Sequence, residues 1–269
     1  MTQESNVGDQ DRNAQDRNAQ DRSAQDFGAL VKEMGQSRSA ARTTWDSDAE
    51  NRAPKTCGKK SQILFGARSA FYKLGFEGAS VDEIARSAGV SKATLYNHYQ
   101  DKTAVFKAII VEDCEEHAHQ IFELEDELAS VDIATTLNRV GRRFIALLLS
   151  PFAQNMYRIV TGEALRFPAL ADAFCKNGPN LIIHLLTEIL EPAIKRGELI
   201  VHDAELAAEQ FLQLCKTGPI HRSAFLNTQS VADVEIERAV NGAVYVFISA
   251  YGSDAEKQKA LAGYGSVKP

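Results

Sequence analysis

The segment from residue 80 to residue 102, SVDEIARSAGVSKATLYNHYQDK, constrains the fold more than any other part of the chain. Ser80 and Glu83 have the spacing of a capping box, in which the serine accepts from a helix amide and the glutamate reaches back to the cap amide. Gly89 ends this short helix, because glycine readily adopts the positive φ that a tight turn needs. Ser91 is of the residue type that caps a second helix. The pattern therefore predicts two short helices joined by a tight turn.

The second of these helices, residues 92–98, has an inner and an outer face. We expect the inner face to pack with the rest of the motif through Ile84, Ala85, Ala88, Val90 and Leu95. The outer face carries a cation, a hydroxyl, an aromatic ring, an amide and an imidazole, a set with little use in packing. A short helix of this kind can enter the DNA major groove, and a helix start favours phosphate, although each residue alone could equally be a solvated polar side chain. The expected DNA-binding residues are Ser80, Ser91, Lys92, Ala93, Thr94, Tyr96, Asn97, His98, Tyr99 and Lys102.

The distribution of charge supports contact with DNA. The whole chain has a net charge of -6, but residues 55–102 carry eight basic and four acidic groups, or +4. Residues 1–54 carry seven basic and ten acidic groups, or -3, which leaves -7 for the remainder. A basic module on an acidic body suits local contact with phosphates, while the rest of the chain is repelled from DNA.

The remaining sequence predicts an all-α protein. Residues 11–25 repeat the motif DRNAQ, DRNAQ, DRSAQ, which has too little apolar content to build a core. From Lys59 onward, apolar residues recur at helical spacing, and one helical segment follows another without sustained strand alternation. The expected divisions are a disordered tail at 1–54, a three-helix helix-turn-helix domain at 55–105, a larger helical domain at 106–252 and a frayed tail at 253–269.

Residues 81–102 resemble the DNA-binding domain of the TetR/AcrR family of bacterial transcriptional regulators. The resemblance is carried by the pattern IA-x-x-AGVS, by Leu95-Tyr96, by the aromatic residue at Tyr99 and by Lys102, and with the preceding helix it covers about residues 59–105. Two positions depart from the family pattern and leave the operator sequence open. Ala93 stands where glycine is frequent, and His98-Tyr99 stand where Tyr-Phe or His-Phe is usual.

The segments 158–174 and 197–214 resemble the C-terminal domain of the AefR-like branch of this family. This resemblance implies a ligand-responsive repressor that controls efflux or a metabolic or signalling operon and is released by a small apolar or amphipathic inducer. A single short recognition helix reads too few bases, so we expect a homodimer on a pseudo-palindromic double-stranded operator.

Helices 203–217 and 231–251 are the expected dimer interface, since the last two helices form a four-helix interface in the family that the chain resembles. The alternative is that the apolar stripes on these helices close the core of the single chain. The candidate seam residues are Leu206, Gln210, Leu214 and Thr217 on one helix, and Val240, Val244, Phe247 and Ile248 on the other.

Helices 132–149, 152–167 and 180–196 could enclose an apolar ligand pocket. A ligand there can release DNA only if it binds better to the arrangement with the wrong spacing between recognition helices. The long helix expected from Lys102 to about Leu128 is the natural lever. The candidate lining residues, each of which could equally be core, are Phe144, Leu148, Met156, Tyr157, Phe174 and His184.

Other chemistry is not expected. The four cysteines lack metal or disulfide spacing, so reduced thiols are expected, with a redox sensor as the alternative. His117 and His119 point to different sides of a helix and cannot easily share a metal. No nucleophile or phosphate-loop motif occurs, so we expect no metal, no cofactor and no enzyme activity.

The expected location is the cytoplasm, since the sequence has neither a signal peptide nor an apolar run long enough to span a membrane. Two other function classes remain open. One is a DNA-independent binding or scaffolding protein that acts through the N-terminal repeat, and the other is an enzyme hosted by the helical body.

Overall fold

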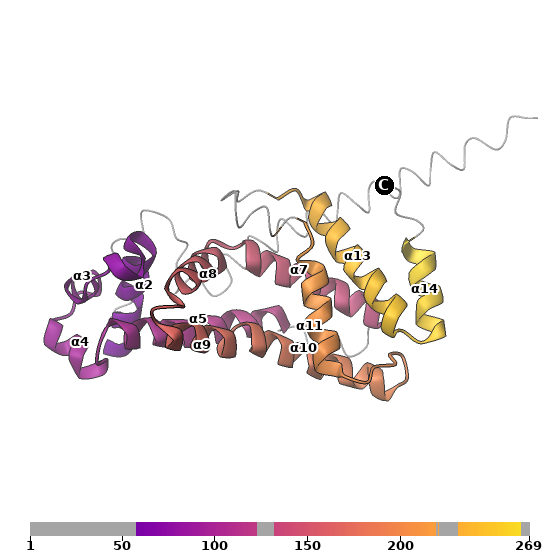
Figure 1. The fold of residues 1–269 in the computed structure, drawn as a ribbon, viewed down its shortest axis with the longest axis horizontal. Helices are drawn as coiled ribbons and strands as arrows, with labels where there is room; N and C mark the ends of the chain where they lie inside the picture. The colour runs from indigo at the N-terminus through magenta and orange to yellow at the C-terminus, as the bar shows by residue number, and fades with distance from the viewer. Residues whose placement is uncertain (1–57, 123–131, 219, 221–230, 265–269) are drawn as a thin grey trace, which may run out of the picture.

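The computed structural model describes residues 58–122, 132–218, 220 and 231–264, and these form an elongated, all-helical molecule (Figure 1). Within those ranges the only β-type contact is an isolated bridge between Leu199 and Gly252. The all-α prediction is therefore confirmed. The predicted N-terminal tail lies outside the described residues, and so do the last residues assigned to the long lever helix.

Three helices at one end of the molecule form the helix-turn-helix module: α2 (Lys59–Gly78), α3 (Val81–Ser87) and α4 (Lys92–His98). The helix α5 (Lys102–Phe122) begins in this module and runs into the body (Figure 1). The module and α5 share an aromatic core, in which the rings of Phe71 and Phe106 lie 4.8 Å apart. The start of α5 is thus packed as part of the helix-turn-helix module.

Seven further helices make up the described body. They are α7 (Ile133–Leu149), α8 (Pro151–Glu163), α9 (Pro168–Asn177), α10 (Pro179–Lys195), α11 (Ala204–Cys215), α13 (Asp233–Tyr251) and α14 (Asp254–Tyr264). Helix α9 packs along α5, α10 packs on α9 and α11, and α13 packs against α7 and α11. No helix among these residues is long and apolar enough to cross a membrane.

Side-chain caps set the starts of several body helices near the predicted positions. Asp132 accepts from the Thr135 amide at 3.0 Å, and Asp203 accepts from the Leu206 amide at 2.9 Å. Each bond satisfies an amide that has no partner within its own helix. The predicted helix ranges 132–149 and 203–217 therefore begin at residues that form caps.

The segment after Gly252 corrects the prediction of a frayed C-terminal tail, because Asp254–Tyr264 forms the helix α14. Acidic residues in its first turn, Asp254 and Glu256, suit the positive end of the helix dipole. Glu256 is buried and accepts from Lys259 at 2.6 Å. The helix packs on α13 with few large apolar residues, and so the hydrophobic pattern did not reveal it.

Candidate nucleic-acid interface

The turn between α3 and α4 has the predicted geometry. Gly89 has a φ of 61°, and the two serines cap their helices, since Ser80 accepts from the Glu83 amide at 3.1 Å and Ser91 accepts from the Thr94 amide at 3.0 Å. The reciprocal arm of the capping box differs from the prediction, because the Glu83 carboxylate pairs with Arg86. Both short helices therefore start at defined residues.

The motif is held against α2 by contacts that the sequence pattern did not reveal. A Cβ placed on Gly66 would lie 2.3 Å from the Cα of Ala88, so the backbones of α2 and the α3–α4 turn are in direct contact. The Gln62 side-chain amide donates to the carbonyl of Ala88 at 2.8 Å. Ile84 and Leu95 are fully buried beneath the motif. Glycine destabilises a helix interior unless close packing requires it. Gly66, inside α2, was therefore the one sequence signal for this close contact.

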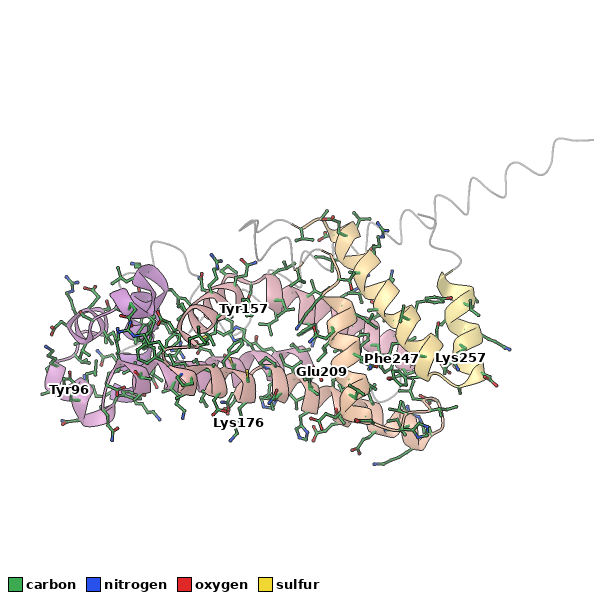
Figure 2. All side chains as sticks on the ribbon, in the orientation of Figure 1. Tyr96, Tyr157, Lys176, Glu209, Phe247 and Lys257 are labelled. Carbon is green, nitrogen blue, oxygen red and sulfur yellow. The ribbon has the colours of Figure 1, made fainter. Side chains whose placement is uncertain are left out.

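The outer face of α4 carries most of the predicted DNA-contacting side chains. Tyr96 is 50% exposed and lies on the outermost helix of the module (Figure 2). The Lys92 ammonium lies 2.8 Å from Asp82 of α3, and this hydrogen bond raises the pKa of Lys92. Thr94 is half-buried, and the exposed remainder of the predicted set on this helix is Lys92, Ala93, Asn97 and His98.

Tyr99 was expected to face DNA, and the structure corrects this. Its backbone is extended, with a φ of -140° and a ψ of 133°, so its side chain does not continue the outer face of α4. Tyr99 is buried, and its hydroxyl has no hydrogen-bond partner among the described residues. Burial raises the pKa of this hydroxyl, and the negative charge of Glu112 adds to the effect.

Lys102 was expected to bind phosphate, but its ammonium is engaged within the module. It donates to the carbonyls of Phe76 at 2.9 Å and Glu77 at 3.2 Å. It also lies 4.7 Å from the centre of the Phe76 ring. Lys102 therefore stabilises the end of α2, where a cation is favoured by the helix dipole, and joins it to the start of α5.

The two predicted dimer seams differ in exposure. Leu206 and Gln210 of α11 and Thr217 in the turn after it are exposed, and Leu214 of α11 is half-buried. On α13, the predicted seam is wrong, because its residues fill the protomer's own core against α7 and α11. The buried α13 residues are Val240, Val244, Phe247 and Ile248. The side of α13 that faces solvent instead carries Val234, Arg238, Val246 and Ser249, with Gly242 partly exposed among them.

The predicted ligand-pocket residues also differ in exposure. Phe144 and Met156 are buried, and Leu148 and Phe174 are half-buried. Tyr157, in contrast, is 54% exposed on the surface of α8, since it lies one residue beyond the buried Met156. The remaining member of the set, on α10, needs a separate correction.

His184 was placed in the core or the pocket, but it is exposed, and its imidazole lies 3.5 Å from the carboxylate of Glu188 one turn later. The apolar run around it buries Ile182, Leu185 and Leu186 instead. An apolar helix still has one solvent-facing side, and His184 lies on that side.

A lysine not predicted from the sequence lies next to this group. The Lys216 ammonium is 5.7 Å from the centre of the Phe144 ring. Lys216 is half-buried, and burial lowers the pKa of its amine while the carboxylate of Glu209 opposes that shift. The sequence placed Lys216 only near the end of the predicted helix 203–217, with no functional role.

The cysteines and histidines give no reactive cluster in the described ranges. Burial raises the pKa of the Cys114 and Cys215 thiols to about 12, which disfavours the reactive thiolate. His117 is half-buried, and its ring stacks on Phe152 with the ring centres 4.1 Å apart. Across the same ranges, no group of three or more His, Cys, Asp or Glu residues could hold a metal ion. Cys57 lies outside those ranges.

Two family models match the chain. One, described as bacterial regulatory proteins of the tetR family, matches residues 63–109. The other, described as the C-terminal domain of AefR-like transcriptional repressors, matches residues 135–253. The first covers the helix-turn-helix module and the start of α5, and the second covers the body from α7 through α13.

Individual proteins agree with these matches. The HTH-type transcriptional regulator UidR of Escherichia coli (strain K12) is 28% identical over 141 residues, which are 52% of this chain and 68% of that protein. The nucleoid occlusion factor SlmA of Yersinia enterocolitica is 30% identical over 147 residues, or 53% of this chain and 71% of that protein.

Solved structures share the fold. A putative TetR-family regulator from Mesorhizobium loti superimposes with a TM-score of 0.69 at 25% identity, over 75% of this chain and all of that one. The flavonoid-responsive regulator FrrA superimposes with a TM-score of 0.61 at 28% identity, over 73% of this chain and 98% of that one.

Proposed function

The chain belongs to the TetR family of bacterial transcriptional regulators, and we propose that it is a ligand-responsive repressor that binds a pseudo-palindromic operator as a homodimer. The observation that carries the proposal is the outer face of α4. Polar and aromatic side chains gather there on a helix whose own position is fixed by two caps and by backbone contact with α2. Such a face can enter a major groove and reach base edges.

Repression is favoured over other uses of DNA binding by the C-terminal match, which is described as a transcriptional repressor domain. Identity alone does not separate a transcriptional regulator from a nucleoid occlusion factor, since the two relatives are 28% and 30% identical. A repressor that acts on the bacterial chromosome would work in the cytoplasm.

The proposed homodimer uses the exposed sides of α11 and α13. Leu206 and Gln210 face solvent on α11, and Val246 faces solvent on α13. Tyr251 of α13 donates to Gln210 at 2.5 Å, so the two helices are already joined within a protomer. Small residues on the stripe of α13, such as Gly242 and Ser249, would let a second copy approach closely.

Sedimentation equilibrium tests this interface. The wild-type protein is expected to be a dimer, and Leu206→Glu is expected to shift it to a monomer, because a carboxylate at a buried interface is costly. Leu165→Glu is the matched control, since Leu165 is fully exposed in the turn after α8. A monomeric wild type, or equal dissociation of both variants, contradicts the proposal.

The proposed inducer is small and amphipathic. Its apolar part would lie near Phe144, Leu148, Met156 and Phe174, which belong to or pack against the body core. A solved relative at 28% identity carries the name flavonoid-responsive regulator, which supports response to a small molecule in this part of the family.

Lys216 gives the proposed inducer its polar end. Its half-buried amine lies over the Phe144 ring, and burial lowers the pKa of this amine. A carboxylate or other electronegative group would complete this environment. Native mass spectrometry of the purified protein is expected to reveal a bound acidic small molecule that is lost in Lys216→Met. Identical adducts in both proteins would contradict this part of the proposal.

Fluorescence anisotropy with DNA from upstream of the chain's own gene tests the DNA-binding face. Lys92→Ala with Tyr96→Ala is expected to weaken binding about 100-fold, since each base-contacting side chain contributes about 1–3 kcal/mol. The melting temperature should stay unchanged, because both side chains are exposed.

A matched control changes the same residue types on the body. Tyr157 and Lys176 are exposed on α8 and α9, far from α4 (Figure 2). Tyr157→Ala with Lys176→Ala should leave DNA affinity at the wild-type value. If the α4 variant binds as tightly as this control, α4 is not the recognition helix.

A further inference from the structure

A buried ionic cluster joins the helix-turn-helix module to the body. Arg68 of α2 donates from Nε to both carboxylate oxygens of Asp113 at 2.9 Å, and from Nη2 to Glu112 at 2.8 Å. Both acidic residues belong to α5. The side chains of Arg68 and Asp113 are only 16% and 8% exposed. One planar guanidinium thus binds two consecutive residues of the helix that leads into the body.

The charges of the cluster act on two buried tyrosines. Tyr99, directly after α4, is buried, and the charges of Glu112 and Arg68 both act on the pKa of its hydroxyl. Tyr72, which lies one turn after Arg68 on α2, is influenced by Asp113 and Arg68 in the same way, after the larger effect of burial. The bonds of the cluster join α2 to α5, and its charges act on the buried tyrosine that follows α4.

A second set of contacts continues from this centre into the body. One turn beyond Asp113, the His117 Nδ1 donates to the Asp113 carbonyl at 2.7 Å, because a carbonyl oxygen can only accept. The His117 ring stacks on Phe152 of α8, with the ring planes 9° from parallel. A displacement of α8 or α5 would therefore act on the same turn of α5 that binds Arg68.

The cluster is a poor device for stability alone. Burial raises the pKa of Asp113, and the bonds from Arg68 only partly offset that effect. Burial also acts to lower the pKa of Arg68, but the bonds to Asp113 and Glu112 reverse that shift and keep the guanidinium charged. Buried ion pairs are often no more stabilising than apolar residues of similar volume. What a forked guanidinium adds is a fixed geometry between the groups it joins.

We propose that Arg68 is a positioning residue for DNA binding, which holds α2, and with it the α3–α4 turn that packs on α2, at a fixed angle to α5 through Asp113 and Glu112. The inference rests on the proposed DNA-binding function. An inducer that moves α5 must lengthen or exchange these bonds, and the recognition helix is then released from its DNA-binding orientation. Arg68 itself contacts no DNA in this account.

Arg68→Lys is the first test, because it keeps the charge and the stem but removes the fork that binds Asp113 and Glu112 together. Arg142→Lys is the matched control. Arg142 of α7 binds Glu237 of α13 at 2.9 Å, with side chains 18% and 20% exposed, wholly within the body. Both variants should lower the melting temperature to a similar extent.

Anisotropy with the upstream DNA separates the two variants. Arg68→Lys is expected to bind at least about tenfold more weakly than wild type, a coupling in the range seen for residues that link sites. Arg142→Lys should stay within about twofold of wild type. Wild-type affinity in Arg68→Lys, or equal losses in both variants, would overturn the inference.

The double variant Arg68→Met with Asp113→Leu guards against loss of folding, because it removes both buried charges together. Glu112 keeps its charge, but its side chain is 34% exposed. The double variant should melt cooperatively and still bind DNA at least about tenfold more weakly than wild type. Wild-type affinity in this variant would also overturn the inference. If the wild-type protein itself fails to bind DNA, it is the proposed function that fails.

Discussion

Two helix crossings in this molecule are built around a glycine, and they differ in what the glycine faces. In the module, a Cβ on Gly66 would lie 2.3 Å from backbone atoms of Ala88. In the body, a Cβ on Gly141 of α7 would lie 2.9 Å from a methyl carbon of Val240 and 3.2 Å from the sulfur of Cys215. Side chains can change rotamer to make room, whereas backbone can do so only if a helix moves.

This difference fits the two proposed roles, DNA recognition by the module and ligand response by the body. A helix that reads base edges must be presented at a fixed angle, and the backbone contact between α2 and the α3–α4 turn fixes that angle. A body that responds to a ligand must have a second packing arrangement, and a crossing made by side chains is more easily rearranged. The junction between these regions is ionic and aromatic, through Arg68, Lys102 and Phe76.

The largest effect is expected for Gly66→Ala. The added methyl group must push α2 away from the α3–α4 turn, so we expect a loss of about 3 kcal/mol in the free energy of unfolding, together with loss of DNA binding. Urea denaturation and anisotropy measure the two effects. Gly162→Ala on α8 is the control, because a Cβ there would meet nothing within 4 Å beyond its chain neighbours and the backbone of its own helix. Equal unfolding free energies and equal DNA affinities in the two variants would show that the contact at Gly66 does not make the module rigid.

Gly141→Ala should have a smaller effect than Gly66→Ala. The neighbouring side chains of Val240 and Cys215 can shift, so the expected loss is about 1–2 kcal/mol in urea denaturation. DNA affinity should stay near the wild-type value, because the module is not disturbed. A loss as large as that of Gly66→Ala would show that the body crossing is no more adaptable than the module.

Lys102→Ala tests the junction between the two regions. It removes two hydrogen bonds to the end of α2 and the contact with the Phe76 ring, so unfolding should become easier by about 1.5 kcal/mol. The salt dependence of DNA binding should keep its slope. If the slope instead becomes shallower by about one, Lys102 contacts a phosphate after all.

The smallest expected difference between the module and the body lies in their helix caps. This difference depends on pH. The module caps α4 with the hydroxyl of Ser91, whereas the body caps α7 with the carboxylate of Asp132. Burial acts to raise the pKa of Asp132, but hydrogen bonds from Thr135 and backbone amides outweigh it and lower that pKa. Its contribution is therefore present above the ordinary carboxyl pKa of about 4 and is lost as the pH falls through the lowered folded value.

Asp132→Ala should cost about 1 kcal/mol at neutral pH, measured by urea denaturation as a function of pH, and the cost should fade in acid. Asp132→Asn keeps an acceptor at the cap without the titrating group, so its stability should lack this component of the pH dependence. A cost of Asp132→Ala that persists unchanged in acid would contradict the assignment.

The two short helices of the module and the turn between them could be predicted from the sequence, because their signals are local. Caps at Ser80 and Ser91, the turn at Gly89 and the buried Ile84 and Leu95 all depend on residues within one or two turns of each other. The prediction that Tyr99 faces DNA was wrong, because Tyr99 lies just past the end of α4, where the extended backbone turns its side chain inward.

The body was harder to predict because its contacts join distant segments. The apolar stripe on α13 was correctly recognised as apolar, but periodicity cannot say whether Val240 and Phe247 face their own core or a second copy. For His184, likewise, the apolar residues around it could not show that its own side chain faces solvent. The contact between Arg68 and Asp113 spans 45 positions in the chain, so no local pattern could reveal it.

The central claim is that the outer face of α4 reads a specific DNA sequence. In vitro selection of genomic fragments by the full chain, followed by footprinting, tests it most directly. We expect enrichment of fragments that contain a pseudo-palindrome, protection of both half-sites, and loss of enrichment in Lys92→Ala with Tyr96→Ala. Equal enrichment by the wild type and that variant, or no enriched sequence at all, would contradict it.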